Sequence, residues 1–170
     1  APIFQVSQAQ YIGCEPLSLQ IQNTSYPING YFTLWNLGDG YYSDEDSPFH
    51  TYEEPGSYDV TLSIVSPTGC YDEQTFDNLV IVNANPVAQF SYTPEEPTNF
   101  DPIVSFTDES TDAVAWEWYF GDGGTSTAQN PVHTYQDTGV HNITLIVTHP
   151  EGCTDTLSST IDIKPDFTYY

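Results

Sequence analysis

The sequence predicts an all-β protein built from two tandem β-sandwich domains. Runs rich in Val, Ile, Thr and Tyr alternate with turn-forming residues, including 13 Pro and 11 Gly, and no long helical pattern occurs. The chain also repeats itself once, which indicates two copies of one small domain. Aromatic residues make up 15% of the chain, so it can build hydrophobic cores despite its high net charge.

Alternation of apolar and polar residues places the strands. In the first such segment, Leu17, Leu19 and Ile21 alternate with polar side chains, which is typical of a strand with one buried face. Later segments of both repeats show the same period of two. The strands expected from these patterns cover residues 17–21, 31–36, 58–64 and 143–147.

The internal repeat is the strongest signal in the chain. Trp118 follows Trp35 by 83 residues, and the same offset holds without a gap from position 35 to 72. The matches are Gly38-Asp39-Gly40 with Gly121-Asp122-Gly123, Pro48 with Pro131, His50-Thr51-Tyr52 with His133-Thr134-Tyr135, Gly56 with Gly139, and Gly69-Cys70 with Gly152-Cys153.

A linker near Val82–Pro86 separates the repeats, since two Asn and a Pro interrupt the β-rich pattern there. The repeat length suits one small domain each. We expect a first domain over residues 1–84, a second over 85–166, and the start of a further linker at 167–170.

The charge of the chain excludes several classes of function. There are 24 acidic residues and one basic residue, Lys164, for a formal net charge of −23. No basic patch can neutralise phosphates, so nucleic acid is not an expected partner, and an anionic membrane surface would repel the chain. No run of 18 apolar residues predicts membrane insertion. The first residues lack the features of a signal peptide, so we expect the export signal to lie outside this fragment.

Both repeats resemble the PKD-type domain, an immunoglobulin-like sandwich named after the polycystic kidney disease protein. The family pattern is an aromatic strand, Gly-Asp-Gly, Pro-x-His-x-Tyr, a Gly and a Val-Thr-Leu strand. The resemblance therefore implies two tandem Ig-like/PKD β-sandwich domains. The residues that carry it are 34–40, 48–52, Gly56 and 60–62 in the first repeat, and 116–123, 130–135, Gly139 and 143–145 in the second.

The motif residues favour structural roles. In each repeat the aspartate is expected to accept backbone N–H groups in its turn, and the histidine to pack and to hydrogen-bond its loop. The tyrosine resembles the corner tyrosine of immunoglobulin-like domains, and the tryptophan is expected in the core, together with Trp116. No catalytic constellation recurs in both repeats, so we expect no catalytic residue and no enzyme. The structural motif residues are Trp35, Asp39, His50, Tyr52, Trp118, Asp122, His133 and Tyr135.

The cysteines predict one disulfide. Cys14 precedes an early strand and Cys70 lies in a late turn of the same repeat, and export permits oxidation. The pairing Cys14–Cys70 would leave Cys153 as a free thiol, because residues 98–101 of the second repeat hold no cysteine. A buried thiol, a reactive thiol and a bond to another chain are the alternatives for Cys153.

Calcium is the candidate cofactor, although none is required. Asp44, Glu45 and Asp46 follow the first Gly-Asp-Gly, and Asp108 and Asp112 lie in a loop of the second repeat. Clustered carboxylates suit Ca²⁺, and some members of the PKD family bind it. The EF-hand spacing is absent, and a solvated acidic surface is the alternative interpretation.

The resemblance extends to the setting of the domains. Gly13-Cys14 and Gly69-Cys70 are similar to PKD repeats of Bacteroidota surface proteins, and the tail 161–170 resembles the strand before a type IX secretion sorting domain. Large gliding-motility adhesins are built this way. This implies a non-catalytic structural and adhesion module at the bacterial cell surface, with neighbouring repeats, the secretion machinery and surface polysaccharide as partners.

A second hypothesis is a substrate-binding accessory module of a secreted polysaccharide- or protein-degrading enzyme. A row of aromatic side chains on the surface would favour it. The strand alternation assigns most aromatic residues to the cores or to the repeated motif, so no such row is expected. A weak three-residue resemblance, Asp155-Thr156-Leu157, suggests O-glycosylation at Thr156.

Overall fold

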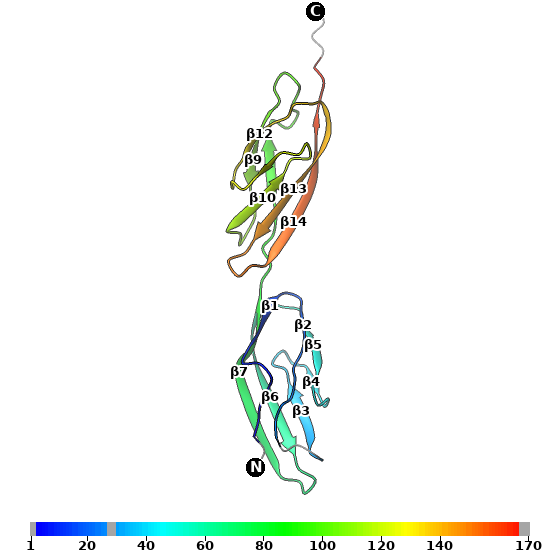
Figure 1. The fold of residues 1–170 in the computed structure, drawn as a ribbon, viewed down its shortest axis with the longest axis vertical. Helices are drawn as coiled ribbons and strands as arrows, with labels where there is room; N and C mark the ends of the chain where they lie inside the picture. Colours follow the sequence, from blue (N-terminus) through cyan, green and yellow to red (C-terminus); the bar gives the residue numbers. More distant parts are fainter. Residues whose placement is uncertain (1–2, 27–29, 167–170) are drawn as a thin grey trace, which may run out of the picture. The chain divides into compact units, whose positions relative to one another are not determined.

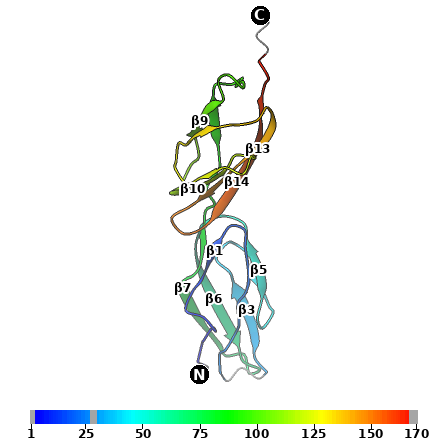
Figure 2. The same ribbon diagram turned by 45° about the horizontal axis from the view of Figure 1, so that its top comes forward.

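The computed structural model describes residues 3–26 and 30–166, which divide into two compact units, Ala1–Ala84 and Asn85–Tyr170. Both units consist of strands, and the described residues contain no helix (Figures 1 and 2). The all-β prediction with two tandem sandwich domains is confirmed. Among the described residues there is accordingly no helix of the length and apolarity needed to cross a membrane. The linker expected at 167–170 lies outside the described residues.

Unit 1 has two sheets. The larger has the order β1-β7-β6-β3-β4, with β1 parallel to β7 and the other pairs antiparallel, and the smaller pairs β2 with β5. The strands are β1 (Tyr11–Cys14), β2 (Leu17–Gln20), β3 (Phe32–Asn36), β4 (Tyr42–Ser43), β5 (Phe49–Tyr52), β6 (Gly56–Val65) and β7 (Tyr71–Asn83).

Unit 2 repeats this plan with two differences, since its smaller sheet has a third strand, β8, and its larger sheet, over residues 85–166, lacks a counterpart of β1. Its sheets have the orders β11-β10-β13-β14 and β12-β9-β8. Among the described residues, no strand pairs with β14 as β1 pairs with β7, and a single parallel bridge joins Thr98 to Lys164 just after β14. The strands are β8 (Phe90–Thr93), β9 (Ile103–Asp108), β10 (Ala115–Tyr119), β11 (Thr125–Ser126), β12 (Val132–Thr134), β13 (Gly139–Thr148) and β14 (Thr154–Ile163).

Each unit has its own core, formed where the alternating residues of the two sheets face each other. In unit 1 the alternation buries Val60, Leu62 and Ile64 on β6, and in unit 2 it buries the matching residues of β13. Trp35 and Trp118 are fully buried at the centres of these cores. Trp116 is partly buried and packs against the unit 2 core.

The cysteines differ from the sequence prediction. Cys14 and Cys153 are disulfide-bonded, whereas Cys70 is a free, exposed thiol. The predicted pair Cys14–Cys70 is therefore wrong, as is the free thiol predicted at Cys153.

The register of β1 on β7 explains why Cys14 and Cys70 cannot pair. Cys14 lies opposite Asn83 at the end of β7, while Cys70 directly precedes Tyr71 at the start of this 13-residue strand. At ~3.3 Å per residue the two cysteines are roughly 40 Å apart. A disulfide needs Cα atoms within ~7 Å.

Candidate functional site

The repeated motif of unit 1 forms a hydrogen-bonded group that we call the Asp–His lock, made of Asp39, His50 and Tyr52. His50 Nε2 lies 2.6 Å from Asp39 Oδ2, and the Tyr52 hydroxyl donates to the Leu37 carbonyl at 2.9 Å. The other oxygen of Asp39 accepts the backbone N–H of Tyr41 at 3.0 Å. These bonds fix the Gly-Asp-Gly turn to β5 on the opposite sheet.

Unit 2 carries the same lock at the same offset, made of Asp122, His133 and Tyr135. His133 Nε2 lies 2.7 Å from Asp122 Oδ2, and the Tyr135 hydroxyl donates to the Phe120 carbonyl at 3.2 Å. Asp122 also accepts the backbone N–H of Gly124 at 2.9 Å. Sequence reasoning gave the aspartate and the histidine separate roles and did not foresee that they bond to each other.

The electrostatics of both locks favour an ionised aspartate. Burial alone would raise the pKa of Asp39, but hydrogen bonds from His50 and from the Tyr41 N–H outweigh it and hold the pKa below its ordinary value. The pKa of Asp122 is lowered against the same opposing effect of burial by His133 and the Gly124 N–H. An ionised carboxylate only accepts hydrogen bonds, so Nε2 of each histidine carries the proton.

Both tyrosines of the locks stay protonated at neutral pH. Burial, followed by the charge of the nearby aspartate, raises the pKa of Tyr52 and of Tyr135 well above the usual range. Each hydroxyl is thus a permanent donor to its carbonyl. With the carboxylate, the histidine Nε2 and the tyrosine hydroxyl engaged inside one unit, the lock is suited to holding a loop.

The candidate calcium ligands do not gather into one cluster. Across residues 3–26 and 30–166 no group of three or more His, Cys, Asp or Glu side chains could hold a metal ion. Asp108 accepts hydrogen bonds from Trp116 Nε1 at 2.7 Å, Gln129 Nε2 at 3.0 Å and the Ser110 N–H at 3.1 Å. Burial would raise the pKa of Asp108, but these donors hold it below its ordinary value.

The remaining candidates lie on exposed loops. Asp46 accepts a hydrogen bond from the Asn23 amide at 3.1 Å, and Asp44 and Glu45 are exposed beside it. Asp112 adopts a left-handed backbone with φ of 58°. Calcium binding by these carboxylates stays a prediction from the sequence.

A second feature of unit 1 is the outward face of its five-stranded sheet, which carries exposed aromatic rings. We call it the aromatic face. Phe32 is 74% exposed, Tyr71 60% and Tyr42 58%, and Leu34 is also exposed. Strand register places them together, because Phe32 and Tyr71 both pair with Val65 of β6, and Tyr42 pairs with Asn36 on β3. The strands that carry them lie side by side in Figure 1.

Val65 lies between Phe32 and Tyr71, and mainly polar side chains fill the space between this row and Tyr42. Together with Leu34 and Tyr42 they line a shallow hollow of about 290 Å³. Hydrogen bonds connect neighbours: Thr61 with Thr75 at 2.8 Å, Ser63 with the Tyr71 hydroxyl at 3.3 Å, and Tyr71 in turn with Glu73. The polar residues of this hollow are Asn36, Thr61, Ser63, Glu73 and Thr75.

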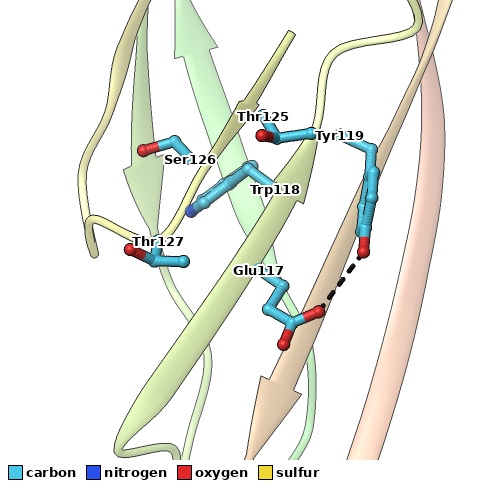
Figure 3. A pocket seen from close by; sticks show the side chains of 6 residues that line it. All are labelled: Glu117, Trp118, Tyr119, Thr125, Ser126 and Thr127. Atoms are coloured by element: carbon cyan, nitrogen blue, oxygen red, sulfur yellow. Dashed lines mark hydrogen bonds between the residues drawn. The ribbon is translucent and has the colours of Figure 1, made fainter. Parts of the chain in front are cut away.

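The matching face of unit 2 has a different composition. Its hollow of about 370 Å³ is lined by Glu117, Trp118, Tyr119 and residues 125–127 (Figure 3). Tyr119 donates to Glu117 at 3.3 Å, while Trp118 points to the other side of β10 into the core. The remaining outward residues of β13 and β14 are mainly Thr and Ser. The offset of 83 replaces Phe32 by Ala115, Leu34 by Glu117, Tyr42 by Thr125 and Tyr71 by Thr154.

The aromatic face overturns the expectation that no aromatic surface row exists. The signal was present in the sequence, because Trp35 is a core residue and Phe32 and Leu34 alternate with it. Residues of opposite phase on a strand point to opposite faces, so a buried Trp35 requires an outward Phe32 and Leu34. The positions of Tyr42 and Tyr71 on this face could not be predicted from alternation, because they depend on the strand register that pairs Tyr42 with Asn36 and Tyr71 with Val65.

Each unit has a corner tyrosine and two facing sheets whose strands are mainly antiparallel. The two units are therefore a tandem of immunoglobulin-like sandwich domains. The profile of the PKD domain family matches residues 1–81 and again residues 83–164. The chain belongs to the PKD domain family.

Several proteins of known kind are similar to it. The pre-pro-metalloprotease PrtV of Vibrio cholerae is 30% identical over 159 residues, which cover 88% of this chain and 16% of that protein. Collagenase ColA of Bacillus cereus is 35% identical over 86 residues, covering 49% of this chain and 9% of that protein. The chain thus spans about a sixth or less of the length of these relatives.

Among solved structures, the PKD1 domain of Vibrio anguillarum Epp is 28% identical and covers 49% of this chain and 99% of that domain, with a TM-score of 0.44. The PKD1 domain of Vibrio cholerae PrtV is 33% identical and covers 47% and 98%, with a TM-score of 0.41. Each of these solved domains thus corresponds to about half of this chain.

Proposed function

We propose that the chain is a non-catalytic attachment module of a larger exported protein. The observation that carries this proposal is the aromatic face of unit 1, because exposed apolar side chains gathered on one surface mark interaction sites. The lock, in contrast, engages its polar groups internally and supports a stable scaffold. The module would hold its parent protein against a target through unit 1.

The finer setting that we propose is a cell-surface adhesin of the gliding-motility type, exported by the type IX secretion system of Bacteroidota. The support is the pair of PKD repeats, the Gly-Cys motifs and the resemblance of the tail to the strand before a sorting domain. Neighbouring repeats and the secretion machinery are the proposed partners. The acidic surface would keep such repeats soluble and prevent them from associating with each other.

One experiment tests the setting directly. Intact mass and peptide mapping of the native parent polypeptide would show what precedes Ala1 and follows Tyr170, and antibodies against this chain would be applied to intact cells. Further acidic repeats, a sorting domain and surface labelling are the expected results. Unlabelled intact cells, with labelling only after lysis, would contradict the proposal.

A second candidate is an accessory module of a secreted hydrolase. It is favoured by the 30% identity to the metalloprotease PrtV over 159 residues and by the similarity to a collagenase. The same peptide map separates the two candidates, since a catalytic domain in the parent polypeptide would assign the chain to an enzyme. Attachment to a target through unit 1 is common to both.

A further inference from the structure

We propose that the aromatic face of unit 1 binds an uncharged polysaccharide. This inference rests on the proposed attachment function and names the chemical class of its target. It uses Phe32, Tyr42 and Tyr71 as ring platforms and the polar side chains between them as hydrogen-bonding groups.

The position of the rings favours a glycan over a protein partner. Phe32 and Tyr71 lie at the two ends of one row across β3, β6 and β7, about 10 Å apart because two strand spacings separate them. Tyr42 lies opposite Asn36, four residues along β3 from Phe32, which corresponds to about 14 Å along the strand direction. Val65 of β6 lies directly between Phe32 and Tyr71, while Thr61, Ser63 and other polar side chains line the hollow between this row and Tyr42, together with Leu34. Protein interfaces commonly have an apolar centre inside a polar rim, whereas here a mainly polar hollow separates the apolar row from Tyr42. Rings on two sides of a polar hollow suit a ligand that offers flat apolar sugar faces and many hydroxyls.

The hydrogen bonds of the face prepare it for hydroxyl groups. The Thr61–Thr75 pair, the Ser63–Tyr71–Glu73 chain and the Asn36–Tyr42 contact at 3.4 Å hold the polar side chains in place. Each of these hydroxyls can still donate or accept a further bond. Side chains that are already ordered lose less entropy when a ligand binds.

Charge argues against an anionic polysaccharide. The net charge of −23 and the Glu73 carboxylate on the face repel sulfated, uronic or phosphorylated chains. The chain has a single basic residue, Lys164, which belongs to unit 2 and is bound to Glu96 at 2.6 Å. Nothing on the face could neutralise an anionic sugar.

The test is affinity gel electrophoresis of the 170-residue chain in gels containing soluble xyloglucan, galactomannan or laminarin, with alginate as the anionic comparison and chitosan as the cationic one. Pull-down on insoluble cellulose and chitin extends the set. The variants are Phe32→Ala, Tyr42→Ala and Tyr71→Ala, alone and together. The matched control is Tyr119→Ala, which removes an exposed ring from the corresponding face of unit 2. Circular dichroism verifies that each variant is folded.

We expect retardation or retention on at least one uncharged polysaccharide, none on alginate, and about a tenfold loss of affinity for each ring removed. Tyr119→Ala should change the affinity less than twofold. The inference is overturned if no uncharged polysaccharide retards or retains the chain, if only chitosan does so and salt abolishes it, or if the triple variant binds like the wild type. Dimerisation that the triple variant abolishes, without glycan binding, would instead assign the face to a second copy. None of these outcomes tests whether the parent protein lies at the cell surface, which the cell-labelling experiment decides separately.

Discussion

The two repeats keep the same lock with different aromatic partners. In unit 1, His50 stacks on Tyr41, which follows the Gly-Asp-Gly turn, at a ring distance of 4.6 Å. In unit 2, His133 stacks on Phe120, which precedes the turn, at 4.1 Å. The 83-residue offset places Gly124 at the position of Tyr41 and Phe120 at the position of Leu37. The ring that stacks on the histidine therefore comes from the residue after the turn in unit 1 and from the residue before the turn in unit 2. In both units an aromatic ring covers the histidine.

A second exchange lies on the other side of the lock. Tyr52 contacts Tyr58 at 4.6 Å, and Tyr135 contacts His141 at 4.7 Å. Tyr58 donates to the Glu54 carbonyl, and His141 Nε2 lies 3.3 Å from the Asp137 carbonyl, which is the matching position. Thus compensated exchanges preserve the lock in both units, whereas the outward face of unit 2 has none of the three rings of unit 1 at the matching positions and carries Tyr119 where unit 1 has Asn36. The part that differs is the part to which we assign target recognition.

The largest expected effect comes from the first glycine of each Gly-Asp-Gly turn. Gly38 and Gly121 have φ of 90° and 84°, and an added Cβ would lie 2.5 Å and 2.6 Å from backbone atoms of Asp59 and Asn142. Gly38→Ala and Gly121→Ala should each cost about 3 kcal/mol or more, because strain and a clash with backbone combine. Urea unfolding followed by tryptophan fluorescence measures this cost.

The second glycine of each turn provides the control. Gly40 and Gly123 also have positive φ, but an added Cβ would meet nothing within 4 Å. Their replacement by Ala should cost only about 1 kcal/mol, from backbone strain alone. Equal costs at both glycines would show that the close approach to Asp59 and Asn142 has no energetic weight.

The aromatic exchange can be tested by transplanting the unit 1 arrangement into unit 2. A Cβ at Gly124 would lie 2.5 Å from His133 Cε1, so Gly124→Tyr alone should cost about 2 kcal/mol. Phe120→Leu alone should cost about 1–2 kcal/mol, because it removes the ring beneath His133. Together they should cost about 1 kcal/mol less than the sum, since the freed histidine can shift onto the new tyrosine.

A double-mutant cycle in urea gives this coupling energy. Tyr41→Gly in unit 1 is the reciprocal control, and it should destabilise by about 1 kcal/mol through loss of the stack on His50. Strict additivity of Phe120→Leu and Gly124→Tyr would mean that the two aromatic positions are independent.

The corner tyrosines should differ in energy because their hydrogen bonds differ in length. Tyr52→Phe leaves the buried Leu37 carbonyl without its donor at 2.9 Å and should cost about 2 kcal/mol. Tyr135→Phe removes a bond of 3.2 Å and should cost about 1 kcal/mol. Thermal unfolding of both variants measures the difference, and a larger loss for Tyr135→Phe would contradict this ranking.

The aspartates of the locks should make stability depend on pH at the acid end. Their folded pKa lies below the ordinary value of 3.8, so their contribution is present above that value and is lost as the pH falls through the lower folded pKa. Asp39→Asn and Asp122→Asn should each cost about 1 kcal/mol near pH 6, since both sites are partly exposed.

The measurement is the stability difference between wild type and each variant from pH 6 to pH 2.5. The difference should shrink below about pH 4, because the wild-type carboxyl then takes up a proton. A difference that stays constant over this range would show that the charge of the aspartate contributes nothing. Asp44→Asn, at an exposed loop position, serves as the control.

The fold could be predicted from the sequence because it depends on periodic patterns and a repeat. Alternation at 17–21 and 58–64 gives strands, and the pairs of Trp, Gly, His and Tyr at one offset give two domains of the same family. The lock could not be predicted in the same way, because neither alternation nor the repeat indicates that an aspartate bonds to the histidine 11 positions later. The aromatic face depended on the strand register that brings Tyr71 and Tyr42 to the sheet beside Phe32.

The cysteines show most clearly where sequence reasoning failed. The prediction matched Cys70 with Cys14 because both lie in one repeat, but the parallel pairing of β1 with the end of β7 separates them by nearly the whole length of that strand. Sequence distance carries no information about which end of a long strand a neighbour pairs with.

The smallest expected effect therefore belongs to Cys70. Because its thiol is free and exposed, and its backbone N–H bonds to Ser66 Oγ at 2.9 Å, Cys70→Ser should change stability by less than about 0.5 kcal/mol. Maleimide labelling of the oxidised, folded chain should modify one thiol, located at Cys70 by peptide mapping, and Cys70→Ser should abolish the labelling. Cys14→Ser should be costly, because a native disulfide typically contributes ~2–4 kcal/mol. If Cys70→Ser destabilised the chain as strongly as Cys14→Ser, Cys70 would have to form the disulfide after all.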